Sequence, residues 1–123
     1  MAAAVGLLAI VGFQLALAFG APLGRAAWGG SHDRLPGRLR VGSAIAAVIW
    51  VLGAAVVLAR GGFDISPVPA TAARWGTWVL VVMLSVGALM NFASRSRWER
   101  FIWAPVALLL AGLCLVLALG PAR

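Results

Sequence analysis

Four long apolar runs, separated by short polar breaks, make up most of this chain. The runs cover residues 2–21, 41–59, 75–92 and 101–119, each is 18 to 20 residues long, and none contains a charged side chain or a histidine. A helix of about 20 apolar residues crosses the hydrocarbon core of a bilayer. Because lipid offers the backbone no hydrogen bonds, single apolar runs of this length must be helical. The pattern therefore predicts an all-α polytopic membrane protein, in which residues 1–123 form a single four-transmembrane-helix bundle.

The first run is predicted to be a retained helix and not a secretory signal. Such a signal needs positive charge before its apolar segment, whereas the first arginine here is Arg25, after the run. The helix is expected to end at Gly20–Gly24, because Pro22 restricts the residue before it and the glycines favour a turn.

Small residues recur every four positions in the first run, at Gly12, Ala16 and Gly20. Residues at this spacing lie on one face of a helix. Such a face allows close approach of a second helix in a membrane. We therefore expect this face to pack against another helix of the bundle.

Arginine is concentrated in two of the three polar breaks. These are the first bend (residues 25–40) and the second bend (residues 94–100), which hold seven of the ten basic residues. Short loops with an arginine excess stay in the cytoplasm. The distribution predicts a multi-pass protein of a bacterial inner membrane, with both bends in the cytoplasm and both termini outside.

The composition suits lipid better than water, since 63% of the 123 residues are hydrophobic and only 11% are charged. The net charge of +7 would suit nucleic acid, but the arginines lie at the ends of apolar runs and not along one face, so no nucleic-acid partner is expected. Anionic lipid headgroups are the expected partners, at about 1 kcal/mol per arginine near the surface. The predicted surface for these headgroups, or for a partner protein, comprises Trp28, Arg38, Arg40, Arg95, Arg97, Trp98 and Arg100.

Five side chains with polar groups are predicted to lie within the bundle. At about 1.5 Å per helical residue, Gln14, Trp50 and Ser85 fall near the bilayer midplane, with Ser43 and Asn91 in a second layer nearer the cytoplasm. An unmet polar group in hydrocarbon costs several kcal/mol, so we expect the Gln14 amide and the Trp50 indole to hydrogen-bond each other. The favoured interpretation of the five is hydrogen bonding between helices, and the alternative is the wall of a ligand-binding pocket.

Several kinds of chemistry are disfavoured. A proton relay through the membrane is disfavoured, because no Asp, Glu, Lys, Arg or His lies within an apolar run. The chain has no lysine, so it cannot form a Schiff base with a carbonyl ligand. His32 and Asp33 lack a third metal ligand, so an ordinary polar loop is favoured. Arg95 and Glu99 have the i, i+4 spacing of a surface ion pair, and Cys114 is expected to be a small buried hydrophobe. Neither a metal nor a cofactor is expected.

Two stretches of sequence resemble a known group of proteins. One combines GAPLG at 20–24, WGG at 28–30, LP at 35–36 and LRVGS at 39–43, and the other combines NFASRS at 91–96, ER at 99–100 and WAP at 103–105. Together they resemble a family of small four-helix bacterial integral membrane proteins of uncharacterised activity. The resemblance implies that the cytoplasmic face is the distinctive surface, and it brings no activity with it. The helix motifs of small fluoride channels are absent.

Three functions remain open from the sequence. The favoured one is a non-enzymatic membrane protein that binds a lipid or apolar ligand, or serves as an accessory subunit. The second is a small channel or transporter formed by a homo-oligomer. The third is an intramembrane enzyme for a lipophilic substrate, with its site among Gln14, Trp50, Asn91 and His32.

The predicted orientation can be tested with single cysteines in a Cys114→Ala background. A cysteine at Ser31 or Ser96 should react only with membrane-permeant thiol reagents, and one at Ser66 should react with impermeant reagents on intact cells. The reverse labelling pattern would contradict the orientation.

Overall fold

The computed structural model describes residues 1–63 and 67–120. Four α-helices follow one another along the chain: α1 (Ala2–Ala18), α2 (Gly37–Arg60), α3 (Ala70–Phe92) and α4 (Ala104–Leu119). No strand occurs in these two ranges. The predicted all-α helical bundle is therefore confirmed.

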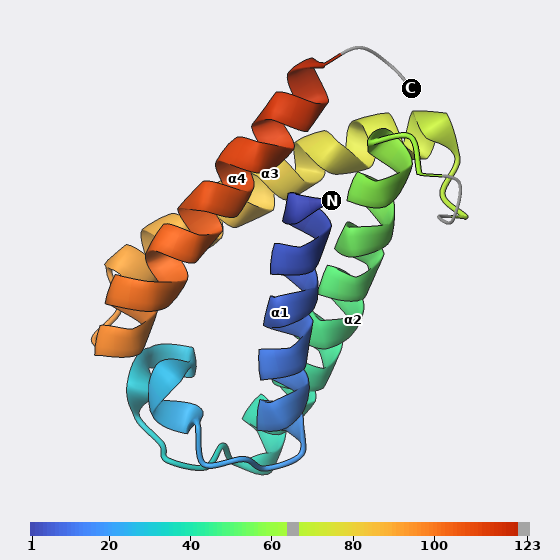
Figure 1. Cartoon of the computed structure of the whole chain (residues 1–123). Helices are drawn as coiled ribbons and strands as arrows, with labels where there is room; N and C mark the ends of the chain where they lie inside the picture. Colours follow the sequence, from blue (N-terminus) through green and yellow to red (C-terminus); the bar gives the residue numbers. More distant parts are fainter. Residues whose placement is uncertain (64–66, 121–123) are drawn as a thin grey trace.

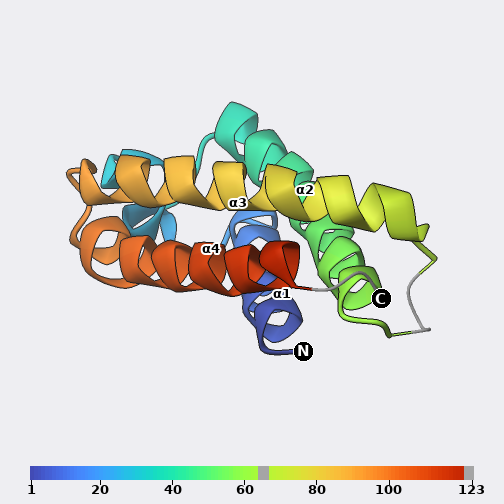
Figure 2. The ribbon, with the colours of Figure 1, turned by 90° about the horizontal axis from the view of Figure 1, so that it is seen from above.

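The four helices form two crossed hairpins. α1 packs against α2, and α3 packs against α4. Seen from above, the pair of α3 and α4 runs across the pair of α1 and α2 (Figures 1 and 2). The hairpins touch at one level of the bundle and spread apart toward the first bend, which lies below the space between them (Figure 1).

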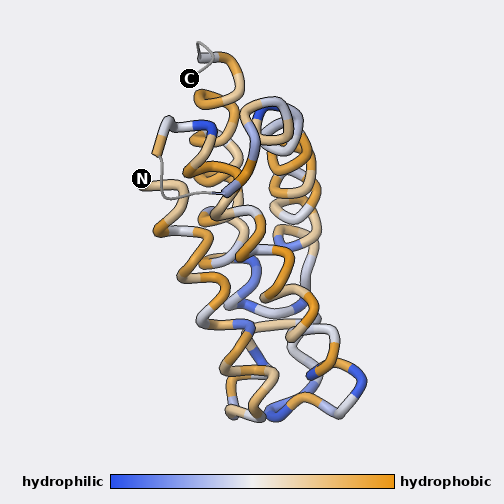
Figure 3. The backbone as a smooth tube through the Cα atoms, turned by 90° about the vertical axis from the view of Figure 1, so that its right-hand side faces the viewer, coloured by the Kyte–Doolittle hydropathy of each residue, from blue (hydrophilic) through white to orange (hydrophobic). Residues whose placement is uncertain are grey.

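The helices are those of a small integral membrane protein. α2, α3 and the last helical segment, Glu99–Leu119, are each long and apolar enough to cross a membrane, and α1 is an apolar helix of 17 residues. Hydrophobic residues run along all four helices, and many of the hydrophilic segments lie at the end of the bundle that holds the bends (Figure 3). Large hydrophobic side chains such as Leu52, Val82 and Leu109 are more than 60% exposed on the outside, which suits a lipid solvent.

α1 ends earlier than the sequence indicated, at Ala18 instead of residue 21. Gly20 has a positive φ of 89°, its N–H bonds to the Leu17 carbonyl, and the Ala21 N–H bonds to the Ala16 carbonyl. This is a Schellman cap, which stops a helix at a left-handed glycine.

The other helices also differ from the predicted ranges at their first turns. α2 begins at Gly37 and α3 at Ala70, each directly after a proline, because the fixed φ of proline suits the residue that precedes a helix. Before α4 the chain forms a wider π-helical turn, Glu99–Trp103. Pro105 explains it, since its ring cannot donate to the Phe101 carbonyl and would crowd that carbonyl in a regular α-helix.

The hairpins cross where glycines allow close approach. A Cβ atom on Gly6 of α1 would lie 2.4 Å from Leu110 of α4, and one on Gly53 of α2 would lie 3.0 Å from Leu80 of α3. Leu7, which is fully buried, packs at the same level. Small residues thus bring the helices together, as is usual in membranes.

The predicted small-residue stripe of the first run is not where this packing occurs. Gly12 is exposed, a Cβ atom there would meet nothing within 4 Å, and Gly20 lies beyond the end of α1. The buried face of α1 is instead built on Ala3, Ala4, Leu7, Val11 and Leu17. The expectation for the stripe was therefore wrong, because the spacing identifies a smooth face but not what covers it.

Two of the three cysteine positions for the orientation test are affected by the structure. Ser31 is exposed and remains suitable, whereas Ser96 is only 6% exposed, so a cysteine there would be shielded on either side of a membrane. Ser66 lies outside the described residues. Ser31 is therefore the informative position for the first bend.

At the opposite end of the bundle, Arg60 joins the two hairpins. It is the last residue of α2 and is 6% exposed, and its Nη2 donates to the Gly120 carbonyl at 2.7 Å and to the Ala118 carbonyl at 3.4 Å. The final carbonyls of a helix have no partner within that helix, and a cation beside them is favourable. Arg60 thus caps α4 from α2.

We predict that Arg60→Met lowers the free energy of unfolding by about 1.5–3 kcal/mol, because charged hydrogen bonds to the part-buried Ala118 and Gly120 carbonyls are lost. The matched control is Arg74→Met near the same end, where the arginine is exposed and lies 5.8 Å from the Trp75 ring. Reversible unfolding in detergent measures both. Equal losses in the two variants would contradict the capping role.

Candidate functional site

The first bend is folded into two short 3₁₀ turns, Gly24–Ala26 and Trp28–Gly30. Two interactions join the start of this segment to Asp33. The Gly24 N–H donates to the Asp33 carbonyl at 2.8 Å, and Arg25 forms an ion pair with the Asp33 carboxylate. A Cβ on Gly24 would lie 2.2 Å from the His32 carbonyl oxygen, so the turns can pack this closely only with glycine there. The bend is a compact structure and not an extended connection.

The two bends are hydrogen-bonded to each other. The Gly29 N–H donates to the Glu99 carboxylate at 2.7 Å, and the Ser96 hydroxyl donates to the Arg25 carbonyl. Ser94 also donates to the Glu99 carboxylate, at 2.8 Å. Residues about 70 positions apart in the chain, one set before α2 and the other before α4, therefore meet in one polar cluster.

Glu99 thus has a different role from the one its spacing predicted. Within the described residues the only ion pair is that of Arg25 with Asp33, and none joins Arg95 to Glu99. The residue begins the π-helical turn, and its carboxylate faces the first bend instead of lying along a regular helix. The i, i+4 rule does not apply to a turn of this geometry.

Trp28 fixes the first bend on α2. Its indole N–H donates to the Ser43 hydroxyl at 2.9 Å, and its ring lies 3.1 Å from the Cβ position of Gly42. Trp28 also has a positive φ of 51°, the only such value for a non-glycine residue in the described ranges. A bulky residue holds this conformation only where its surroundings over-determine it.

Between the hairpins, above the docked bends, lies a cavity of about 740 Å³. All four helices and both bends contribute to its wall. Its main lining residues are Ile10, Phe13 and Gln14 of α1, Ala46 and Trp50 of α2, Met83, Gly87, Met90 and Asn91 of α3, Trp28, His32 and Arg38 of the first bend, and Glu99, Trp103 and Ala107 before and on α4.

Three of the five predicted interior residues line this cavity, and two do not. Gln14, Trp50 and Asn91 come together on its wall from three different helices. Ser43 is fully buried and is the partner of Trp28. Ser85 is exposed on the outer face of α3, so its placement in a pocket is not supported.

The expected hydrogen bond between Gln14 and Trp50 is absent. The Gln14 Oε1 atom is buried without a partner among the described residues, and so is the Nδ1 atom of His32. Both residues line the cavity. Since the indole N–H of Trp50 could bond only to the Oε1 atom of the Gln14 amide, the prediction of a direct bond was wrong.

The cavity is closed on one side and reaches the surface on another. The rings of Phe13 and Trp103, with centroids 4.6 Å apart, close it between α1 and the start of α4. Met90 lines the cavity and is also 69% exposed, so the cavity meets the molecular surface along α3. An opening there faces lipid, since α3 is one of the membrane-spanning segments.

The predicted headgroup surface is partly used within the protein. Arg40 donates to the Ala18 carbonyl at 2.9 Å and so completes the cap of α1, and Arg38 lines the cavity. The side chains of Arg95, Arg97, Trp98 and Arg100 are exposed. Arg38 and Arg40 are exposed as well, so both bends present arginines at the surface.

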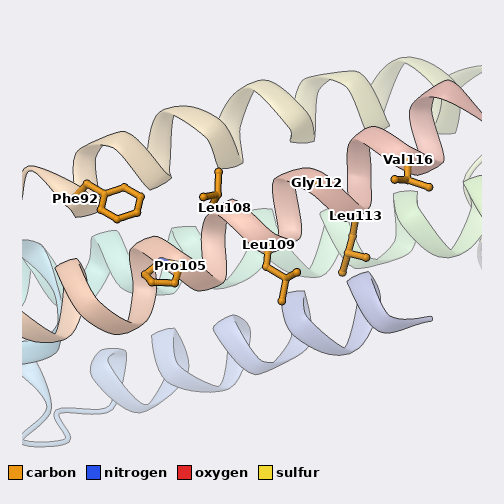
Figure 4. Close-up of a pocket in the computed structure, with 7 residues that line it drawn as sticks. All are labelled: Phe92, Pro105, Leu108, Leu109, Gly112, Leu113 and Val116. Atoms are coloured by element: carbon orange, nitrogen blue, oxygen red, sulfur yellow. The ribbon is translucent and has the colours of Figure 1, made fainter.

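A second hollow is a groove of about 590 Å³ along the outside of α4. Figure 4 shows it with Leu108, Leu109 and Val116 on α4 and Phe92 at the end of α3. Every residue that lines it is apolar or glycine. The groove therefore offers no polar group for chemistry.

No group of three His, Cys, Asp or Glu side chains that could hold a metal ion occurs in the described ranges. No model of a protein family, no curated protein and no solved structure matches the chain. The site must therefore be interpreted from its own geometry.

Glu99 and Trp103 line the cavity but were not among the predicted site residues. Glu99 was assigned to a surface ion pair and Trp103 to the expected helix, whereas His32, favoured as an ordinary loop residue, was placed in a site only under the enzyme alternative. The signal in the sequence was the concentration of arginine in the two bends, each of which also holds a tryptophan. That clustering marks the bends as distinctive but does not show that they touch.

The contact between the bends can be tested at two neighbouring glycines. Gly29 and Gly30 both have positive φ, at 82° and 77°, but a Cβ on Gly29 meets nothing within 4 Å, whereas one on Gly30 lies 2.9 Å from the Arg25 oxygen and 3.0 Å from Ser96. We predict that Gly29→Ala costs about 1–2 kcal/mol of backbone strain and that Gly30→Ala costs clearly more. Unfolding and amide exchange of the first bend measure this. Equal costs would show that the bends are not tightly docked.

Proposed function

We propose that this protein is a non-enzymatic membrane protein that binds one lipophilic molecule with a polar head in the cavity between its hairpins. The observation that carries the proposal is the cavity itself, with buried polar atoms of Gln14 and His32 that lack partners in a largely apolar wall. Pockets for single small molecules have volumes of about 300–1,000 Å³ and a few placed polar groups. The cavity has both features.

The wall is divided into an apolar part and a polar part. Ile10, Trp50, Met83 and Leu84 come from the middle of their helices and suit a hydrocarbon chain. Methionine side chains adapt well to irregular apolar ligands. His32, Arg38, Asn91 and Glu99 lie at or next to the bends and suit a polar head. An amphipathic molecule matches this division.

An occupant would also remove an energetic cost. A buried polar atom without a partner costs about 1–3 kcal/mol. Gln14 and His32 each have such an atom, and Trp28 cannot serve either of them because its indole N–H is bonded to Ser43. A head that hydrogen-bonds to both residues would recover this energy on binding.

The orientation belongs to the same proposal. The arginine excess of the two bends supports a cytoplasmic location for them in a bacterial inner membrane, with both termini outside. Anionic headgroups would then contact the exposed residues around the polar cluster, namely Trp28, Arg38, Arg40, Arg95, Arg97, Trp98 and Arg100. The ligand would enter from the inner leaflet, past Met90.

Two further points support binding by a single chain. The cavity is formed within one chain, so it requires no homo-oligomer of the kind that a channel between subunits would need. The two stretches that resemble small four-helix bacterial membrane proteins are also the stretches that form the polar end of the cavity. We propose that the chain belongs to that family and that its members share this cavity.

The proposal is tested by filling the cavity. Gly87 lines it, and a Cβ there meets nothing within 4 Å, so Gly87→Leu adds bulk to the space without a clash at the backbone. Native mass spectrometry of the protein extracted from its membrane should show one retained lipophilic molecule, and Gly87→Leu should abolish this retention.

Gly112→Leu is the matched control, because Gly112 lies on the outer groove and its Cβ position is equally free. This variant should keep the bound molecule. Wild-type protein without any retained molecule, or the same retention in Gly87→Leu, would contradict binding in the cavity.

A further inference from the structure

We infer that the polar head of the ligand is uncharged and carries hydroxyl groups, and that the ligand has a single hydrocarbon chain, as in a monoacylglycerol. The inference rests on the proposed function, because it names the class of molecule that the same cavity takes. It follows from the hydrogen-bonding capacity and the charges that the wall leaves unused.

The polar part holds buried groups whose hydrogen-bonding capacity the protein leaves unmet. Gln14 Oε1 and His32 Nδ1 are buried without a partner among the described residues, and the Glu99 carboxylate can accept more bonds than the two it receives from Gly29 and Ser94. Trp28 cannot serve these groups, since its indole N–H is bonded to Ser43. A head that only accepts hydrogen bonds, such as an ester or a quinone carbonyl, would leave Gln14 Oε1 and the Glu99 carboxylate unmet, since these oxygens only accept.

Charge argues for a neutral head. Glu99 is the one acidic residue on the wall, and Arg38 is the one basic residue apart from His32. A carboxylate or phosphate head would meet Glu99 as well as Arg38, and an ammonium head would meet Arg38 as well as Glu99. Like charges in a site of low dielectric are strongly disfavoured. Neither ionic class fits.

A hydroxyl fits both His32 and Gln14 for one reason. It donates one hydrogen bond and also accepts, so it can pair with the imidazole in either tautomer and with either end of an amide. Two or more hydroxyl groups on adjacent carbons can reach several acceptors at once. A glycerol head has this arrangement.

The apolar part limits the ligand to one chain. The cavity has a volume of about 740 Å³ in total, including its polar end, and Phe13 and Trp103 close it on the side of α1 and α4. This volume lies within the range for one small molecule. A second acyl chain would have to remain outside, past Met90.

The test compares four ligands that share one chain and differ only in the head. The probes are 1-(9,10-dibromostearoyl)glycerol, the methyl ester of the same acid, the free acid and the corresponding amine. Bromine quenches nearby tryptophan fluorescence, and Trp28, Trp50 and Trp103 line the cavity. The full chain, with Trp75, Trp78 and Trp98 changed to Phe, is measured in phosphatidylcholine nanodiscs, whose headgroups carry no hydroxyl.

We expect the glycerol probe to saturate the quenching at a mole fraction at least about tenfold lower than the methyl ester, because each unmet buried acceptor weakens binding by about that factor or more. Gln14→Leu and His32→Phe should each reduce this preference. Ser85→Ala is the control, since Ser85 is a polar residue of α3 on the exposed face. Glu99→Gln, which can still accept from Gly29, should strengthen binding of the free acid.

The possible failures are distinguishable. If all four probes saturate equally and Gly87→Leu abolishes the saturation, the head specificity is wrong while ligand binding in the cavity stands. Tighter binding of the acid or the amine would overturn the neutral head in the same way. If no probe saturates in wild-type protein, or if Gly87→Leu has no effect on any of them, the proposed function itself is contradicted.

Discussion

The docking of one arginine-rich bend on the other is the contact on which the rest of the structure depends. Lipid supplies no hydrophobic force to hold helices together, so packing and hydrogen bonds must do so. The hairpins touch near Gly6 and Gly53, where small residues allow close packing. Away from that level they diverge, and the bonds of Glu99 and Ser96 to the first bend span the divergence. Without these bonds the first bend would not cover the space between the hairpins.

The same docking explains why a cavity persists in a protein of only 123 residues. Helices that cross at an angle leave a wedge on one side of the crossing point, and side chains normally fill it. Here the wedge holds Gly87 and Ala46, which are too small to fill it, and the folded first bend covers it from below. The polar groups at this covered end include the side chains of His32, Arg38 and Glu99. Under the proposed function, the bends recognise the polar head and the helices contribute the apolar wall.

The sequence predicted the helices well and the site only in part. Uncharged runs identify membrane helices because the cost of burying charge is large, but they do not locate ends such as Ala18 or Ala70, which depend on a Schellman cap and on a proline. Depth along a helix correctly grouped Gln14 with Trp50, yet depth says nothing about direction around the helix axis, so Ser85 was placed inwards although it is exposed. Glu99 could not have been assigned from spacing, since its partner Gly29 lies 70 residues away.

Trp28 links the binding site to the fold. Its ring is part of the cavity wall, its N–H is bonded to Ser43 on α2, and its backbone has an unfavourable positive φ. A conformation of this kind holds only while the surrounding contacts outweigh its strain. Any molecule that packs against the ring binds the docked form of the first bend and not the undocked form, and so stabilises it by mass action. Under the proposed function, ligand binding and docking of the first bend are therefore coupled equilibria.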